Sequence, residues 1–258
     1  MNDSNRIDIQ AAGAGTIATG AYRSVNISGS ATLTGDIDCI DLKVSGAANG
    51  NGTLHSENIT VLGILDYRGD VDAGEMRVSG TATTRALRIR EVHTTGTLST
   101  SSLSATSVDL LGHLRVEGDL EAERFTAMGL FTVVGLLNAG VVDVTLGGKC
   151  TANEIGGEAI VVRTGVGPIK KFVTSLIPGM EMRLWAGTIE GDDVRLESTT
   201  ARVVRGKTVV IGSECKIDLV EYTGEYTVAP DAVVGEARKV VADEPPVPAA
   251  ATATPDEA

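Results

Sequence analysis

Apolar and polar residues alternate along most of the chain, and the alternation recurs at a fixed spacing. Mostly apolar residues stand four before, two before and two after a repeated glycine, as Val25, Ile27 and Ala31 do around the first one. The intervals between successive glycines of this set are 17, 17, 17, 16, 16 and 17: Gly29, Gly46, Gly63, Gly80, Gly96, Gly112 and Gly129. Alternation with a period of two predicts strands, and helical spacing is absent from the unit.

A unit of 16–17 residues built from short alternating segments predicts one turn of a β-helix, so we expect an all-β solenoid. Stacked turns join through parallel ladders about 4.8 Å apart, and the inward residues form columns. We expect glycine at the corners, where the backbone needs unusual dihedral angles or close approach. The ladder uses every N–H group, which excludes proline, and Pro168 is the first proline of the chain.

The repeat divides the chain into segments. We expect a flexible Gly/Ala/Thr-rich arm over 1–21, a first β-helix block over 22–162, a loop insertion over 163–182, a second block over 183–238 and a disordered Pro/Ala-rich tail over 239–258. In the second block Leu184, Ala201 and Ile217 follow one another at intervals of 17 and 16, which indicates that the period continues.

Charge and cysteine usage narrow the classes of function. The net charge of −12 argues against nucleic-acid binding through phosphate attraction. Cys39, Cys150 and Cys215 lie far apart without metal-ligand spacing, and the N-terminus lacks an apolar signal core. We therefore expect a cytoplasmic protein with reduced thiols.

Three motifs resemble functional sites but fit structural explanations better. Residues 13–18 match GxGxxA and residues 201–208 approach a phosphate-binding loop, yet neither is followed by a helical pattern, and we interpret 13–18 as part of the arm. The acidic group around Glu190 is interpreted as a solvated turn. His55, His93 and His113 occupy different phases of the repeat, so we expect no shared histidine site. We expect no catalytic residue, cofactor or metal, and hence no enzyme.

The ends of a solenoid expose apolar layers and unpaired strand groups, and no amphipathic capping helix is evident at either end. An uncapped β-helix covers its ends by stacking on another copy, which produces filaments when the contact does not close. The candidate polymerisation residues are Tyr22, Val25 and Ile27 near one end, and Val228, Val233 and Val234 near the other.

The 16–17-residue turns, the acidic character, the Pro-rich tail and the run Ile189–Glu197 with ARVVRGKTV at 201–209 together resemble the bactofilins, a family of polymer-forming bacterial cytoskeletal proteins. The resemblance implies a right-handed β-helix, nucleotide-free polymerisation with itself or a paralogue, and a scaffold role in cell shape, cell-wall organisation or motility. It also implies membrane-associated or cell-wall partners and a location at the inner face of the membrane. The apolar and basic N-terminal peptide of some members is missing here.

The sequence also suggests one candidate contact segment and two alternative functions. Lys170, Lys171 and Phe172 lie in the expected insertion and form a candidate contact with a partner or a membrane. A capped β-helix enzyme or binding scaffold, acyltransferase-like or carbohydrate-active, is the alternative to a cytoskeletal scaffold, and an extracellular adhesin is the third possibility.

Overall fold

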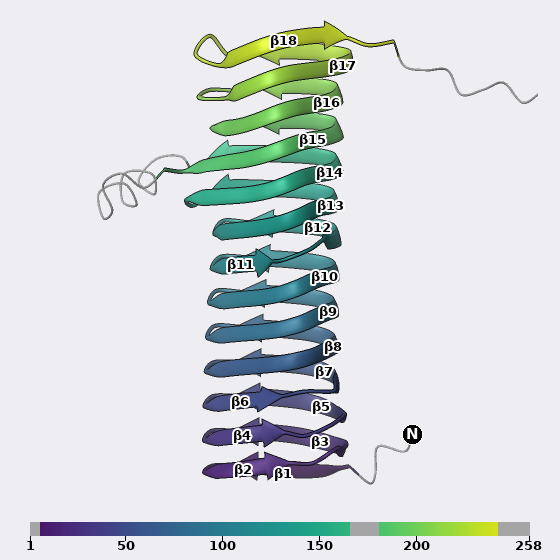
Figure 1. Cartoon of the computed structure of the whole chain (residues 1–258), viewed down its shortest axis with the longest axis vertical. Helices are drawn as coiled ribbons and strands as arrows, with labels where there is room; N and C mark the ends of the chain where they lie inside the picture. The colour runs from purple at the N-terminus through teal and green to yellow at the C-terminus, as the bar shows by residue number, and fades with distance from the viewer. Residues whose placement is uncertain (1–5, 166–180, 242–258) are drawn as a thin grey trace, which may run out of the picture.

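The computed structural model describes residues 6–165 and 181–241. It shows one straight β-helix, in which successive turns of the chain stack through parallel strands, and it contains no α-helix in those ranges (Figure 1). The strands are β1 Ile7–Ala11, β2 Ala14–Ile17, β3 Gly20–Ile27, β4 Ser30–Leu33, β5 Ile37–Val44, β6 Ala47–Gly50, β7 Thr53–Val61, β8 Ile64–Val78, β9 Thr81–Thr94, β10 Thr97–Leu110, β11 His113–Val116, β12 Leu120–Ala127, β13 Leu130–Leu146, β14 Lys149–Thr164, β15 Arg183–Leu196, β16 Thr199–Ile211, β17 Lys216–Val228 and β18 Val233–Lys239.

Each strand pairs in parallel with the equivalent strand one turn away. Between β9 and β10, for example, Leu87 faces Leu103 and Val92 faces Val108, so the partners differ by 16 in sequence number. Between β5 and β7 the difference is 17, with Leu42 facing Ile59. The predicted all-β solenoid and its repeat length are therefore confirmed.

The core consists of columns of inward-facing side chains that run along the stack. In the longest apolar column, every member from Val25 to Val209 is at most 1% exposed. This column contains Ile9, Val25, Leu42, Ile59, Met76, Val92, Val108, Phe125, Val142, Ile160, Val194, Val209 and Tyr226. Small aliphatic residues dominate because each layer of a thin solenoid leaves room for few large rings.

The repeated glycines lie at a corner where successive turns approach closely. A Cβ atom added at Gly46 would lie 2.0 Å from the carbonyl oxygen of Gly29, and one added at Gly63 would lie 1.9 Å from that of Gly46. Neither glycine has a positive φ; in the described residues this conformation occurs in glycine only at Gly35 and Gly52. Close approach of the backbone is therefore the reason for glycine in this column.

The prediction of a flexible arm over 1–21 is wrong for its described strands, because β1, β2 and the start of β3 form the first turn of the stack. Gly13 precedes Gly29 by one repeat, and Ile9 and Ala11 occupy the inward positions before it. A Cβ atom at Gly29 would lie 2.3 Å from the carbonyl oxygen of Gly13, as in later turns. The first turn was missed because Ala11 and Gly15 are small and weaken the apolar pattern.

The spacing predicted for the second block is also wrong at its first step. Leu184 pairs with Thr199, and Ala186 with Ala201, so partners in β15 and β16 differ by 15 in sequence number and not by 17. Thr199 is fully buried, and its hydroxyl donates to the carbonyl oxygen of Glu197 at 2.9 Å. A buried threonine satisfied by its own backbone is invisible to a count of apolar residues.

The other segment boundaries are partly described. β14 extends to Thr164, into the start of the predicted insertion, and β15 begins at Arg183. Lys239, predicted to open the tail, is the last residue of β18. Lys170, Lys171 and Phe172 lie outside the described residues, as do 242–258.

Candidate assembly surfaces at the two ends of the solenoid

The N-terminal end presents strand edges that have no partner among residues 6–165 and 181–241. β1 pairs with β3 on one side, and β2 pairs with β4. Ile7 is 58% exposed, whereas Ile9 and Ala11 are partly buried and pack against the core from one side only. Unpaired N–H and C=O groups beside an apolar layer form a template for another strand.

The three residues predicted for this interface lie one turn too deep. Val25 and Ile27 are at most 1% exposed, since Ile9 and Ala11 of β1 cover them. Tyr22 is 9% exposed, and its hydroxyl donates to the carbonyl oxygen of Ala18 at 2.7 Å. The terminal layer at this end consists instead of Ile7, Ile9 and Ala11, because residues 7–17 form the first turn of the stack.

The C-terminal end is uncovered along one side of its last complete turn. β18 pairs with Lys216–Tyr222 of β17, so no described strand lies over Glu225–Val228. Val228 is 47% exposed there, although it continues the column of fully buried Ile211. This strip is the second strand surface with unpaired groups.

The residues predicted for the C-terminal end divide into two groups. Val228 and Val234 belong to inward columns, since Val234 faces buried Ile217. Val233 is 60% exposed and faces outward, because it pairs with the exposed Lys216. Sequence reasoning missed Tyr226, which pairs with Val209 and therefore continues its column.

Tyr226 stacks on Tyr222 over this end, with ring centroids 5.1 Å apart. The column that begins with Ile9 ends with Tyr226, and the column that begins with Ala11 ends with Val228. The two surfaces lie at opposite ends of the stack (Figure 1). A second copy placed head to tail would set Ile9 over Tyr226 and Ala11 over Val228, and both columns would continue across the junction.

A groove of about 870 Å³ runs along the side of the stack over β13–β17. Gly157, Gly191 and Gly206 follow one another in register along its floor, and without side chains they leave the surface hollow. At its edge Arg205 pairs with Glu221 at 2.7 Å and with Glu190 at 3.6 Å. The interpretation of the acidic group around Glu190 as a turn is wrong, because it lies within the continuous strand β15.

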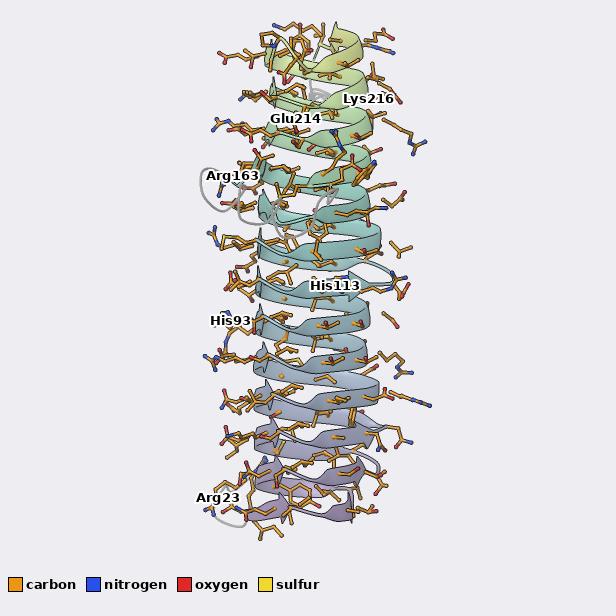
Figure 2. The ribbon with its side chains drawn as sticks, turned by 90° about the vertical axis from the view of Figure 1, so that its left-hand side faces the viewer. Arg23, His93, His113, Arg163, Glu214 and Lys216 are labelled. Carbon is orange, nitrogen blue, oxygen red and sulfur yellow. The ribbon has the colours of Figure 1, made fainter. Side chains whose placement is uncertain are left out.

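The three histidines lie on different strands, and the three cysteines form no disulfide bond. His55, His93 and His113 lie on β7, β9 and β11, and Figure 2 shows His93 and His113 apart on the stack. The cysteines are buried and unbridged. Burial raises the pKa of the Cys150 and Cys215 thiols to about 11, so both stay protonated near neutral pH.

Fold and surfaces define this protein as a β-solenoid whose two described ends carry uncovered strand edges. The chain is 39% identical over 109 residues to the uncharacterized protein YhbE of Bacillus subtilis (strain 168), a match covering 42% of this chain and 44% of YhbE. It is 37% identical over 107 residues to the uncharacterized protein YhbF of the same organism, covering 41% of this chain and 42% of YhbF. The matches thus span less than half of either relative.

No protein-family model matches the sequence, and no solved structure matches it. Residues 6–165 and 181–241 contain no helix long and apolar enough to cross a membrane.

Proposed function

We propose that the protein is a self-assembling scaffold whose copies join end to end into nucleotide-independent filaments. The observation that carries this proposal is the pair of uncovered apolar layers at opposite ends of the stack, formed by Ile7, Ile9 and Ala11 and by Tyr226 and Val228. Joining two such surfaces buries apolar area and also supplies partners for the unpaired strand groups.

The shape of the molecule favours a filament. Because the two surfaces lie at opposite ends of a straight stack, a contact at one end leaves the other end free for a further copy. A head-to-tail contact of this kind does not close into a ring, and alternating contacts between like ends also propagate. Either arrangement gives a thin polymer without any nucleotide.

The resemblance to bactofilins extends this proposal to the cell. We propose a cytoskeletal role in cell shape, cell-wall organisation or motility, with the protein itself or a paralogue as the polymer partner. Membrane-associated or cell-wall proteins would bind the sides of the polymer, which stay accessible when the ends are occupied. Handedness and location at the inner face of the membrane belong to the same proposal.

Negative-stain electron microscopy and light scattering of purified, nucleotide-free protein test the assembly. Ile9→Arg and Val228→Arg each place a charge in an end contact, and burying an unpaired charge costs several kcal/mol. We expect filaments for the unsubstituted protein and none for either variant. Leu111→Arg is the matched control, because Leu111 is 57% exposed on the side of the stack, and it should still assemble.

The size of the residual species reports the orientation of the contact. If copies join head to tail, each single variant is monomeric, since every contact uses both ends. If like ends join, each variant stops at a dimer held by its intact end. Val25→Arg does not serve as a test because it buries a charge in the core and destabilises the fold. Short rods in the unsubstituted protein at high concentration would reject the filament.

The groove over β13–β17 favours a second candidate, a binding scaffold for an extended carbohydrate chain. Its edge alternates Glu190, Arg205 and Glu221, which offer charged hydrogen-bond partners to hydroxyl and carboxylate groups along one line. Calorimetry with soluble cell-wall glycan fragments tests it, with Arg205→Ala expected to weaken binding and Arg23→Ala, on a distant turn, to leave it unchanged. Equal heats for both variants would reject this candidate.

A further inference from the structure

Four side chains of β8, β9 and β10 meet on one outer face in the middle of the stack. Glu75 and Glu91 face each other across neighbouring turns, and His93 stands two positions after Glu91 on the same face. Asp109 faces His93 from the next turn. Figure 2 shows His93 projecting outward from the side of the solenoid.

Ligand atoms of Glu75, Glu91 and His93 are separated by distances typical of atoms that coordinate one metal ion. His93 Nε2 lies 3.5 Å from Glu75 Oε1 and 3.7 Å from Glu91 Oε2, and each of the three residues has a ligand atom within 4.8 Å of those of the other two. Bonds of about 2.1 Å around a tetrahedral zinc ion place neighbouring ligand atoms about 3.4 Å apart. A small adjustment of these side chains therefore accommodates the ion.

Asp109 prepares the histidine for this role. Its Oδ2 lies 3.1 Å from His93 Nδ1, whereas His93 Nε2 lies closest to Glu75 and Glu91, so the two ring nitrogens face different carboxylates. A second-shell carboxylate of this kind fixes the tautomer and the ring orientation of metal-binding histidines.

The local charge balance also favours a bound cation. Elsewhere on the stack carboxylates face arginines from a neighbouring turn, as Asp72 faces Arg88 at 2.7 Å. Glu75 and Glu91 instead oppose each other, which is destabilising for like charges. In the described part of the chain, the ion pairs shown for Glu91 are with His93 alone.

Glu75 Oε1 is buried and accepts no hydrogen bond, although the guanidinium of Arg77 contacts it as an ion pair. Arg77 is 60% exposed, so its side chain has room to move aside for a competing cation. Glu75, Glu91 and Asp109 carry three negative charges against the single positive charge of Arg77, which leaves an excess that a divalent ion would neutralise.

We propose that Glu75, Glu91 and His93 bind a divalent transition-metal ion of the zinc class, with Asp109 as a positioning residue. Imidazole as a ligand favours zinc, nickel or copper over magnesium and calcium. Three protein ligands on an open face leave a fourth position for water. The ion would join β8 to β9 and relieve the repulsion between the two glutamates.

Calorimetric titration of untagged protein with zinc chloride, repeated with magnesium chloride, tests the site. We expect one zinc ion per chain, no comparable binding of magnesium, and visible absorption bands of a low-coordinate site when cobalt replaces zinc. His93→Ala and Glu91→Gln should each weaken zinc binding at least tenfold. Far-UV circular dichroism confirms that each variant is folded.

His113→Ala is the matched control, since His113 is a partly exposed histidine on another face of the repeat, and it should bind zinc like the unsubstituted protein. Asp109→Asn should weaken binding about 10- to 100-fold and shift the cobalt spectrum, as expected for a second-shell residue. Absence of saturable zinc binding, or equal affinity in His93→Ala and the unsubstituted protein, would overturn the proposal. Neither the calorimetric titration nor the cobalt spectrum depends on whether the protein forms filaments.

Discussion

The glycine column makes a sharp prediction about Gly63, which lies at the corner between β7 and β8. Substitution to alanine places a Cβ atom 1.9 Å from the carbonyl oxygen of Gly46 and 2.6 Å from that of Ser45. Ordinary contact begins near 3.4 Å, so the turns must separate locally by about 1.5 Å (3.4 − 1.9). The obstacle is backbone on both sides, which side-chain rotation cannot relieve.

The backbone hydrogen bonds at this corner determine how much stability Gly63→Ala should lose. The amides of Leu62 and Gly63 donate to the carbonyl oxygen of Val44 at 2.8 and 3.0 Å, and the amide of Ile64 donates to Gly46 at 2.9 Å. A displacement of this size breaks these three bonds. At about 1 kcal/mol net for each bond, the substitution costs about 3 kcal/mol.

Urea unfolding followed by circular dichroism measures this cost, and hydrogen exchange locates it. We expect a lower unfolding midpoint for Gly63→Ala and faster exchange of amides in β6–β9. The control is Gly13→Ala in the first turn, where an added Cβ meets no atom within 4 Å because no described turn lies below it. This variant should stay within about 0.5 kcal/mol of the unsubstituted protein.

A change below about 0.5 kcal/mol for Gly63→Ala, or an equal loss for Gly13→Ala, would refute the close-approach explanation. The comparison isolates the neighbouring turn, because both glycines occupy the same phase of the repeat and neither has a positive φ.

The remaining predictions concern the buried thiols. Cys39, Cys150 and Cys215 should react with a colorimetric thiol reagent far more slowly in the folded protein than in urea, and fast reaction without denaturant would contradict their burial. Burial raises the pKa of Cys150 and Cys215 from 9.0 to about 11, so folding favours the protonated thiols. Their contribution to stability is fully present below about pH 9 and is lost as the pH rises toward 11, by roughly 2 to 3 kcal/mol for each thiol at most. Urea unfolding across this range should show a flatter pH dependence for the double variant Cys150→Ala/Cys215→Ala, and an unchanged slope would reject this account.

The candidate surfaces show why sequence reasoning reached the fold more readily than the sites. The prediction that the ends carry exposed apolar layers named Val228 and Val234, and the structure places both at the last inward position of their columns. It placed Val25 on the surface, however, because a first turn with Ala11 at an inward position lacks a strong apolar signal.

The cluster around His93 was missed for a different reason. The three histidines occupy different phases of the repeat, which predicts that they share no site with one another. The side chains that complete the cluster are carboxylates on three turns. Asp109 shares the column of His93, but Glu75 and Glu91 belong to a neighbouring column, and only the stacking register shows that they face each other beside His93.

The sequence by itself determined the all-β solenoid, its repeat length and most of its inward residues. Parallel turns stacked in register require the same type of residue at the same phase of every turn. The architecture is therefore visible in the sequence as a periodic pattern of apolar residues and glycines. The tertiary structure alone decided the shortened step at Thr199, the identity of the first and last turns, and the neighbours of His93. These depend on which residue of one turn lies over which residue of the next, and this register is set by packing and hydrogen bonding between turns and not by the alternation within one.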